Sequence, residues 1–257
     1  AGEAAMADVI TGGRLEMSIA RGAYTYEYER LMPGMDAWEA GQRLRETVPM
    51  LRKLWGGDYA HDGEFYQFPS TSSMPTPVQQ PGPPMWIAAR DPSSHEFAVD
   101  NGCNVQVTPL WQGDEEIESL MERFNAAVEK SAQERPKIML LQHGYVGADK
   151  ADVEFGVNAL SRFYGDFGAW FANKRPVSHG IISPLNDEDR AKMPALSPDA
   201  LRETLSIGTA PEVIERLKHY EALGFDEYSL WLDNGMTFDA KRAMLDRFMT
   251  EVMPAFS

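Results

Sequence analysis

The chain has 257 residues, 43% hydrophobic and 25% charged, and these ordinary proportions exclude disordered, collagen-like and coiled-coil classes. Its 24 basic and 39 acidic residues give a formal net charge of −15, which disfavours nucleic-acid binding and docking on an anionic membrane, because both need clustered Lys and Arg. One cysteine excludes an internal disulfide framework, and no apolar run approaches the roughly 20 residues of a membrane span, so we expect a cytoplasmic protein.

The first residues are rich in Ala and Met, a composition typical of a helix, and Gly12-Gly13 would end that helix by supplying a positive φ. The pattern is already helical at residue 1, with neither an initiator Met nor the layout of a signal peptide. We therefore expect that upstream sequence is absent; a processed or naturally short N-terminus is the alternative.

Strands and helices then alternate along the chain, which predicts an α/β fold with a parallel sheet covered by helices. Strands are expected at 15–19, 85–89, 104–108, 137–147 and 226–232, and helices at 36–54, 93–101, 114–130, 149–173, 211–223 and 239–253. Two stretches interrupt the alternation, 59–84 and 175–198, and are expected to be loop excursions from a single domain, 1–257. No dinucleotide-binding Gly-x-Gly-x-x-Gly or phosphate-binding P-loop motif follows a strand.

The first candidate site lies at the end of the strand at 15–19, where Arg21-Gly22 leads to Tyr24. The carboxyl ends of parallel strands carry the ligands of βα barrels. An Arg offers a planar fork of donors that suits a phosphate, and a Gly lets the backbone approach closely. The alternative is an Arg that pairs with a surface carboxylate.

The second candidate site is the junction 88–95, which ends one strand and opens a helix. Its free backbone N–H groups, the positive end of the helix dipole, Arg90 and the hydroxyls of Ser93 and Ser94 together favour an anion. The alternative is an ordinary helix cap formed by Ser93 or Asp91. The Asp91 carboxylate would also oppose an anion unless it points away.

Other reactive residue types carry weaker signals. No two of the five histidines are spaced as a metal pair, and no Ser-His-Asp or Cys-His arrangement stands out. We interpret His143 as a hydrogen-bonded core residue, His61 as part of a turn, and Cys103 as a small buried apolar residue. Four tryptophans could line a pocket, although such positions usually belong to the core: Trp38, Trp55, Trp170 and Trp231.

Four blocks, in order, resemble the bacterial luciferase-like flavin monooxygenases: 12–24 (GGRLEMSIARGAY), 75–101 with PVQ leading into PMWIAA, 207–217 (IGTAPEVIERL) and 251–256 (EVMPAF). The resemblance implies a (β/α)8 TIM barrel of which this chain supplies roughly strands 4–8, the first three βα units being absent. It further implies reduced FMN delivered by a separate flavin reductase, O2 as co-substrate, oxidation of a small, largely apolar organic molecule, and a homodimer.

The same resemblance implies that Arg21 holds the FMN phosphate, assisted by Arg43, while the junction from Arg90 to Ser94 closes over it. The implied cofactor-binding set is Arg21, Gly22, Tyr24, Arg43, Ala89, Arg90, Asp91, Ser93 and Ser94. Asp91 departs from the family, which uses Ser at that position. No catalytic residue is assigned, because the family's active-site His belongs to the absent strands.

Two other functions remain open. A deazaflavin (F420)-dependent oxidoreductase would use the same fold for hydride transfer without O2. A non-catalytic luciferase-like subunit would bind a partner and turn nothing over. An assay of NAD(P)H- and reductase-dependent O2 consumption separates the non-catalytic subunit from the monooxygenase.

Overall fold

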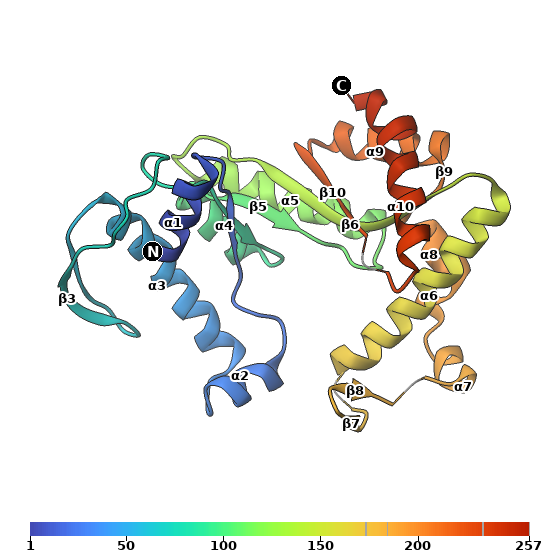
Figure 1. Ribbon diagram of the computed structural model, residues 1–257, viewed down its shortest axis with the longest axis horizontal. Coiled ribbons are helices and arrows are strands. Elements are labelled where there is room, and N and C mark those ends of the chain that lie inside the picture. The colour runs from blue at the N-terminus through green and yellow to red at the C-terminus, as the bar shows by residue number, and fades with distance from the viewer. Residues whose placement is uncertain (173, 184, 233, 257) are drawn as a thin grey trace. The chain divides into compact units, whose positions relative to one another are not determined.

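The computed structural model describes residues 1–172, 174–183, 185–232 and 234–256 (Figure 1). The chain divides into two compact units. The first unit comprises Ala1–Gln106 and Arg123–Ile138, and the second comprises Val107–Glu122 and Met139–Ser257. The chain passes from one unit to the other after Gln106, within α5 (Asp114–Lys130) and near the start of β6 (Ile138–Gly147). The expectation of a single barrel domain with loop excursions stays a prediction.

The first unit is built on three parallel strands, β1 (Met17–Ile19), β4 (Met85–Ala88) and β5 (Asn104–Val107). Their register places Ser18 beside Trp86, and Trp86 beside Asn104. The other elements of this unit are α1 (Gly2–Thr11), α2 (Thr25–Leu31), α3 (Ala37–Gly56), β2 (Tyr59–Asp62), β3 (Gln67–Thr71) and α4 (Pro92–Asp100). Gly12 and Gly13 end α1 with φ of 66° and 78°, as predicted.

Local sequence explains where the two helices nearest the candidate site begin. The Asp36 carboxylate accepts a hydrogen bond from the backbone N–H of Glu39 at 2.8 Å and so caps α3. In α4, Asp91 accepts from the N–H of Ser94 at 3.0 Å, and Pro92 occupies the first helical position, where its missing N–H costs nothing. Both helices lie where the sequence predicted them.

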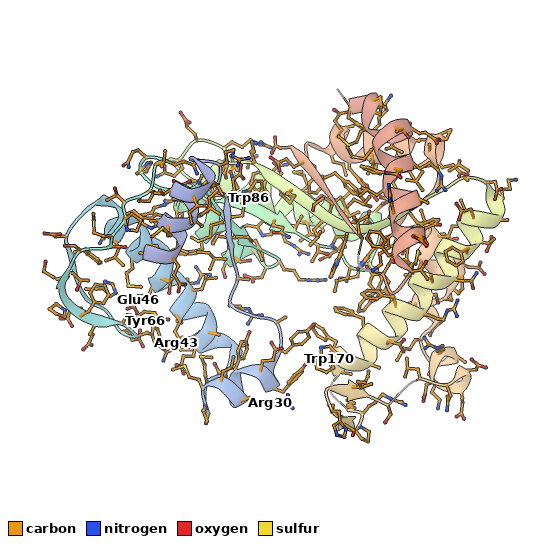
Figure 2. The ribbon with its side chains drawn as sticks, in the orientation of Figure 1. Arg30, Arg43, Glu46, Tyr66, Trp86 and Trp170 are labelled. Atoms are coloured by element: carbon orange, nitrogen blue, oxygen red, sulfur yellow. The ribbon has the colours of Figure 1, made fainter. Side chains whose placement is uncertain are left out.

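The excursion at 59–84 contains an antiparallel hairpin, β2 and β3, clamped to α3 through Glu46. The Glu46 carboxylate lies 2.8 Å from His61 Nε2 and accepts the backbone N–H groups of Phe65 and Tyr66, each at 2.9 Å (Figure 2). The Tyr59 hydroxyl lies 2.7 Å from the other ring nitrogen of His61. The interpretation of His61 as a turn residue is therefore wrong, because it belongs to β2 and is held by a partner 15 positions earlier in the chain.

The second unit is organised around β6, a ten-residue strand that changes partner along its length. Residues 139–143 pair in parallel with β10 (Glu227–Trp231), and residues 144–147 pair in parallel with β9 (Ser206–Thr209). The change falls at Gly144, where an added Cβ would lie 2.8 Å from the Ser206 carbonyl oxygen. The helices of this unit are α6 (Lys150–Ala172), α7 (Asp187–Ala191), α8 (Pro198–Thr204), α9 (Ala210–Leu223) and α10 (Phe238–Arg247).

Three details of the second unit differ from expectation. β9 and α8 were not predicted. The sequence of β9, Ser-Ile-Gly-Thr, is too short and too polar to show an apolar alternation. The last helix ends at Arg247, and a π-helical turn (Phe248–Val252) and a 3-10 turn (Met253–Phe256) follow it. The excursion at 175–198 holds a short hairpin, β7 (Val177–Ser178) with β8 (Ile181–Ile182), besides α7 and the 3-10 turn Pro194–Leu196.

Within the described ranges, no helix combines the length and the apolarity needed to cross a bilayer.

Candidate functional site

The end of β1 places Arg21 against the beginning of α3. The exposed Arg21 side chain donates from Nη1 to the Ala37 carbonyl oxygen at 2.9 Å. Gly22 has a φ of 94°, and a Cβ there would lie 2.9 Å from the ring of Tyr28, whose hydroxyl donates to the Gly22 carbonyl. The turn therefore requires glycine. Tyr24 follows as the N-cap residue of α2, with its ring centroid 5.4 Å from that of Tyr26.

The junction between β4 and α4 is closed by hydrogen bonds of its own. The buried Ala89 donates its N–H to the Gln106 carbonyl at 3.0 Å, and Arg90 donates its N–H to Ser94 Oγ at 3.0 Å. The Asp91 carboxylate accepts from Ser93 Oγ at 2.8 Å and from the Ser94 N–H. Burial alone would raise the pKa of Asp91, but these bonds lower it below the usual value, so the group stays ionised at neutral pH. The Asp91 carboxylate therefore caps α4 and does not point away from the candidate anion site.

Arg45 reaches this junction, although the sequence did not single it out. Its Nη2 donates to the carbonyl oxygen of Ser93 at 3.1 Å and to Ser93 Oγ at 3.0 Å, and its guanidinium lies 4.9 Å from the ring centroid of Phe97. Helical spacing is the signal that could have found Arg45. Ala37, Gly41 and Arg45 are four residues apart, so they lie on one face of α3.

Arg43, the residue that the resemblance selected, makes different contacts. It forms an ion pair with Glu39 at 2.7 Å, and its guanidinium lies 4.8 Å from the ring centroid of Phe65 in the hairpin (Figure 2). Residues two positions apart on a helix do not share a face, which is why Arg43 meets the hairpin and Arg45 meets α4. The described contacts place Arg45, rather than Arg43, at the junction.

One face of α3 connects the two candidate sites. A Cβ on Gly41 would lie 3.9 Å from Arg21 Cδ, so the Arg21 side chain runs along the turn between Ala37 and Arg45. Two guanidinium groups and the Ser93 hydroxyl are therefore carried by adjoining segments. Such forked donors can hold a phosphate through charge-assisted hydrogen bonds, and these residues fit one. The Asp91 charge offsets part of that attraction.

The second unit gathers aromatic side chains around a buried histidine. We call this set the aromatic cluster: Trp111, His143, Phe163, Tyr164, Phe167 and Trp231. The His143 and Trp231 rings are stacked, with centroids 4.1 Å apart and planes at 17°, because the two residues are register partners on β6 and β10. His143 is fully buried, and its Nδ1 lies 2.8 Å from the Tyr164 hydroxyl, as expected for a hydrogen-bonded core residue. Burial raises the pKa of Tyr164, so its hydroxyl keeps its proton.

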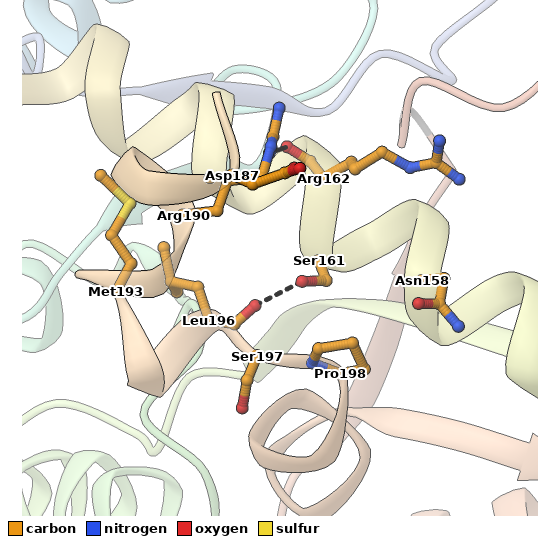
Figure 3. A pocket seen from close by; sticks show the side chains of 10 residues that line it. Asn158, Ser161, Arg162, Asp187, Arg190, Met193, Leu196, Ser197 and Pro198 are labelled. Atoms are coloured by element: carbon orange, nitrogen blue, oxygen red, sulfur yellow. Dashed lines mark hydrogen bonds between the residues drawn. The ribbon is translucent and has the colours of Figure 1, made fainter. Parts of the chain in front are cut away.

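A cavity of about 350 Å³ lies elsewhere in this unit, between α6, α7 and α8 (Figure 3). Ser161 on its wall donates to the Leu196 carbonyl at 2.6 Å (Figure 3). Arg190, also on the wall, pairs with Asp166 at 3.0 Å. None of the sequence-predicted site residues lines it. Across the described ranges, no group of three or more His, Cys, Asp and Glu residues could hold a metal ion. Cys103 is fully buried and lies 3.4 Å from Arg52 Nη2.

Comparison with known proteins agrees with this fold. The family model described as luciferase-like monooxygenase matches residues 1–227. The chain belongs to the luciferase-like monooxygenase family. Among the family's curated members, the oxygenase component of a flavin-dependent trigonelline monooxygenase from Acinetobacter baylyi is 60% identical over 258 residues, which cover 100% of this chain and 72% of that relative.

More distant luciferase-like relatives share less. An F420-dependent glucose-6-phosphate dehydrogenase from Mycobacterium tuberculosis is 27% identical over 221 residues, covering 82% of this chain and 60% of its own. Among solved structures, the monooxygenase RslO1 from Streptomyces bottropensis has a TM-score of 0.79 at 22% identity and covers 100% of this chain and 73% of its own. The oxygenating constituent of 3,6-diketocamphane monooxygenase from Pseudomonas putida was solved with FMN. It has a TM-score of 0.67 at 12% identity, and the match covers 97% of this chain and 73% of that one. At these identities the two structures establish the fold alone.

These findings confirm the predicted family, its luciferase-like α/β fold and the enzyme class, a flavin-dependent monooxygenase. The cofactor-binding residues remain predictions.

Proposed function

We propose that this chain belongs to the oxygenase component of a two-component monooxygenase, which receives reduced FMN from a separate flavin reductase. It would use O2 to oxidise an N-methylpyridinium carboxylate such as trigonelline, a charged molecule in place of the largely apolar one that the resemblance implies. The observation that carries the proposal is the 60% identity, over the whole chain, to the oxygenase component of a trigonelline monooxygenase. That relative also supports the two-component arrangement, because an oxygenase component needs a source of reduced flavin.

The first unit would hold the flavin phosphate. Arg21 and Arg45 supply forked donors, and Ser93 supplies a hydroxyl close to the N-terminus of α4. Bound reduced FMN would supply the electrons that activate O2, whereas the protein binds the phosphate, orients the ring and excludes water. We further propose that the protein is a homodimer and works in the cytoplasm, which light scattering of the purified enzyme and cell fractionation would test.

F420-dependent hydride transfer is the second candidate, and the 27% identical glucose-6-phosphate dehydrogenase supports it. The two cofactors differ in their use of oxygen. A monooxygenase consumes O2 together with its substrate, whereas hydride transfer to or from F420 proceeds equally well without O2.

The decisive experiment combines the full-length protein with a flavin reductase, NADH, FMN and trigonelline. We expect an oxygenated product, seen by mass spectrometry, that depends on trigonelline, on the reductase and on this protein and that takes up label from 18O2. O2 uptake alone is not diagnostic, because free reduced FMN reacts with O2. Substrate turnover with F420 under anaerobic conditions would replace this proposal with the second candidate. Binding of trigonelline without any turnover would indicate the non-catalytic subunit.

A second experiment tests the phosphate site by titrating dithionite-reduced FMN into the protein. Hydrogen bonds to charged groups contribute about 1.5–3 kcal/mol, so Arg21→Ala should weaken binding by one to two orders of magnitude. Arg14→Ala is the matched control, since Arg14 is an exposed residue of the same unit whose Nε donates to the Thr11 carbonyl at 2.8 Å. Equal affinities for the two variants would contradict the assignment of Arg21.

A further inference from the structure

The aromatic cluster differs from an ordinary hydrophobic core in its exposure. Core residues of the same unit, such as Leu160, are fully buried, whereas Trp231, Phe163 and Phe167 are only partly buried. Phe171, the next residue of the α6 stripe, is 47% exposed. Ligand sites are lined predominantly by apolar and aromatic side chains such as these.

The rings are also held in fixed orientations. Phe163, Phe167 and Phe171 recur once per turn of α6, and the first two are stacked, with centroids 6.0 Å apart and planes at 13°. Trp231 is fixed by strand pairing with His143 and by stacking on its ring. The Tyr164 hydroxyl fixes the imidazole in turn, at 2.8 Å. Because these rings are already held in place, a ligand that stacks on them would cost little further side-chain conformational entropy.

The chemistry of these surfaces favours a flat cation. The face of an aromatic ring attracts positive charge, and that of tryptophan does so most strongly. An N-methylpyridinium ring combines a planar surface with a permanent positive charge, so it gains both stacking and cation–π attraction.

We propose that the aromatic cluster binds the pyridinium ring of the substrate, with Trp231 as the principal stacking residue. The inference rests on the proposed function, because the substrate class comes from the trigonelline monooxygenase relative. It goes beyond that function by naming the side chains that recognise the ring and the property they select, which is the positive charge on the ring nitrogen.

The test is a calorimetric titration of the full-length, flavin-free protein with three probes: trigonelline, 1-methylpyridinium and nicotinate. Nicotinate keeps the ring and the carboxylate but lacks the fixed positive charge. Trp231→Leu should weaken trigonelline binding by about threefold to thirtyfold.

Trp231→Phe, which keeps an aromatic ring, should weaken trigonelline binding less than Trp231→Leu does. Trp38→Leu is the matched control, because Trp38 lies on α3 of the first unit and is 67% exposed.

A specific role in recognition predicts a pattern that general damage to the fold would not produce. The dissociation constant for reduced FMN should stay within about twofold in Trp231→Leu, while that for trigonelline rises. Nicotinate should bind the wild type more weakly than trigonelline does, and its affinity should fall less in Trp231→Leu. If Trp231→Leu fails to fold, Phe167→Leu provides the same comparison on α6, with near-ultraviolet circular dichroism as the check on packing.

The outcomes separate the two proposals. If the wild type oxidises trigonelline but Trp231→Leu and Phe167→Leu bind it unchanged, the cluster is not the recognition site and the proposed function stands. If trigonelline is not oxidised but 1-methylpyridinium still binds in a Trp231-dependent way, the cluster stands and the proposed substrate is wrong. If neither trigonelline nor 1-methylpyridinium binds the wild type, the assignment of the cluster is overturned, and turnover of trigonelline with the reductase then decides the proposed function.

Discussion

The two units of the chain build candidate binding surfaces in opposite ways. The surface of the first unit consists of charged side chains fixed by hydrogen bonds to backbone carbonyls: the exposed Arg21 donates to Ala37, and the half-buried Arg45 donates to Ser93. The aromatic cluster of the second unit is fixed by ring contacts around the buried His143. The first surface should therefore respond to changes in charge, and the second to loss of volume.

The largest expected effect is on the stability of the second unit. Tyr164 is 1% exposed and its hydroxyl pairs with His143, so Tyr164→Ala leaves a cavity and an unsatisfied imidazole. Removal of a large buried aromatic side chain costs about 3–5 kcal/mol of unfolding free energy, measured by urea denaturation. Phe171→Ala, on the same helix but 47% exposed, should cost less than about 1 kcal/mol. Equal losses would contradict the assignment of Tyr164 to the packed centre of the cluster.

The second effect decides between two arginines of α3. The structure places Arg45 at the N-terminus of α4, whereas the family resemblance selects Arg43, which pairs with Glu39. Arg45→Ala should raise the dissociation constant of reduced FMN by about tenfold or more. Arg43→Ala should change it by less than about threefold, because the Arg43 guanidinium pairs with Glu39 within α3 and does not reach the junction. The reverse order would restore Arg43 to the phosphate site.

Added salt gives another way to distinguish the charged surface of the first unit from the aromatic cluster of the second. Phosphate binding by exposed guanidinium groups is screened as ionic strength rises, because the Debye length falls from about 10 Å at 0.1 M to about 3 Å at 1 M. The affinity for reduced FMN should therefore fall more steeply with salt than the affinity for 1-methylpyridinium, which rests on stacking and cation–π contact with partly buried rings rather than on pairing between ionised side chains. Parallel salt dependences, measured by titration between these two concentrations, would remove the distinction between the two surfaces.

The sequence was informative wherever the determinants are local. The cap at Asp36, the Pro92 start and the Gly12 stop locate three helix boundaries, and the polar junctions locate the strand ends. It failed where partners are distant in the chain. The role of His61 depends on Glu46, and the choice between Arg43 and Arg45 depends on which helix face meets α4. The stacking of His143 on Trp231 likewise depends on strands far apart in sequence.

The Asp91 carboxylate offers a smaller effect at the first surface. Asn caps helices as well as Asp does, so Asp91→Asn should keep α4 intact while removing a negative charge beside the proposed phosphate. A charge near a helix end is worth about 0.3–1 kcal/mol, so the affinity for reduced FMN should rise about twofold to fivefold. Because the pKa of Asp91 is lowered, its charge is constant between pH 6 and pH 8, and the gain should be the same at both. An affinity that falls would show that the carboxylate helps to hold the flavin.

A last effect, on stability rather than on binding, concerns the hairpin clamp of the first unit, where Glu46→Gln keeps the shape and removes the charge. Burial alone would raise the pKa of Glu46, but the N–H groups of Phe65 and Tyr66 together with His61 lower it.

A carboxyl group whose pKa is lower in the folded than in the unfolded state stabilises the protein at pH values above its unfolded pKa, which is about 4.3 for Glu. This contribution is lost as pH falls through the folded-state pKa. The melting temperature of the wild type should therefore exceed that of Glu46→Gln at pH 7, and the gap should close below about pH 4. Asp62→Asn, an exposed position on the same hairpin, should show no such closing gap. Parallel melting curves for Glu46→Gln and the wild type would mean that the clamp acts through shape, as the aromatic cluster does, and not through charge.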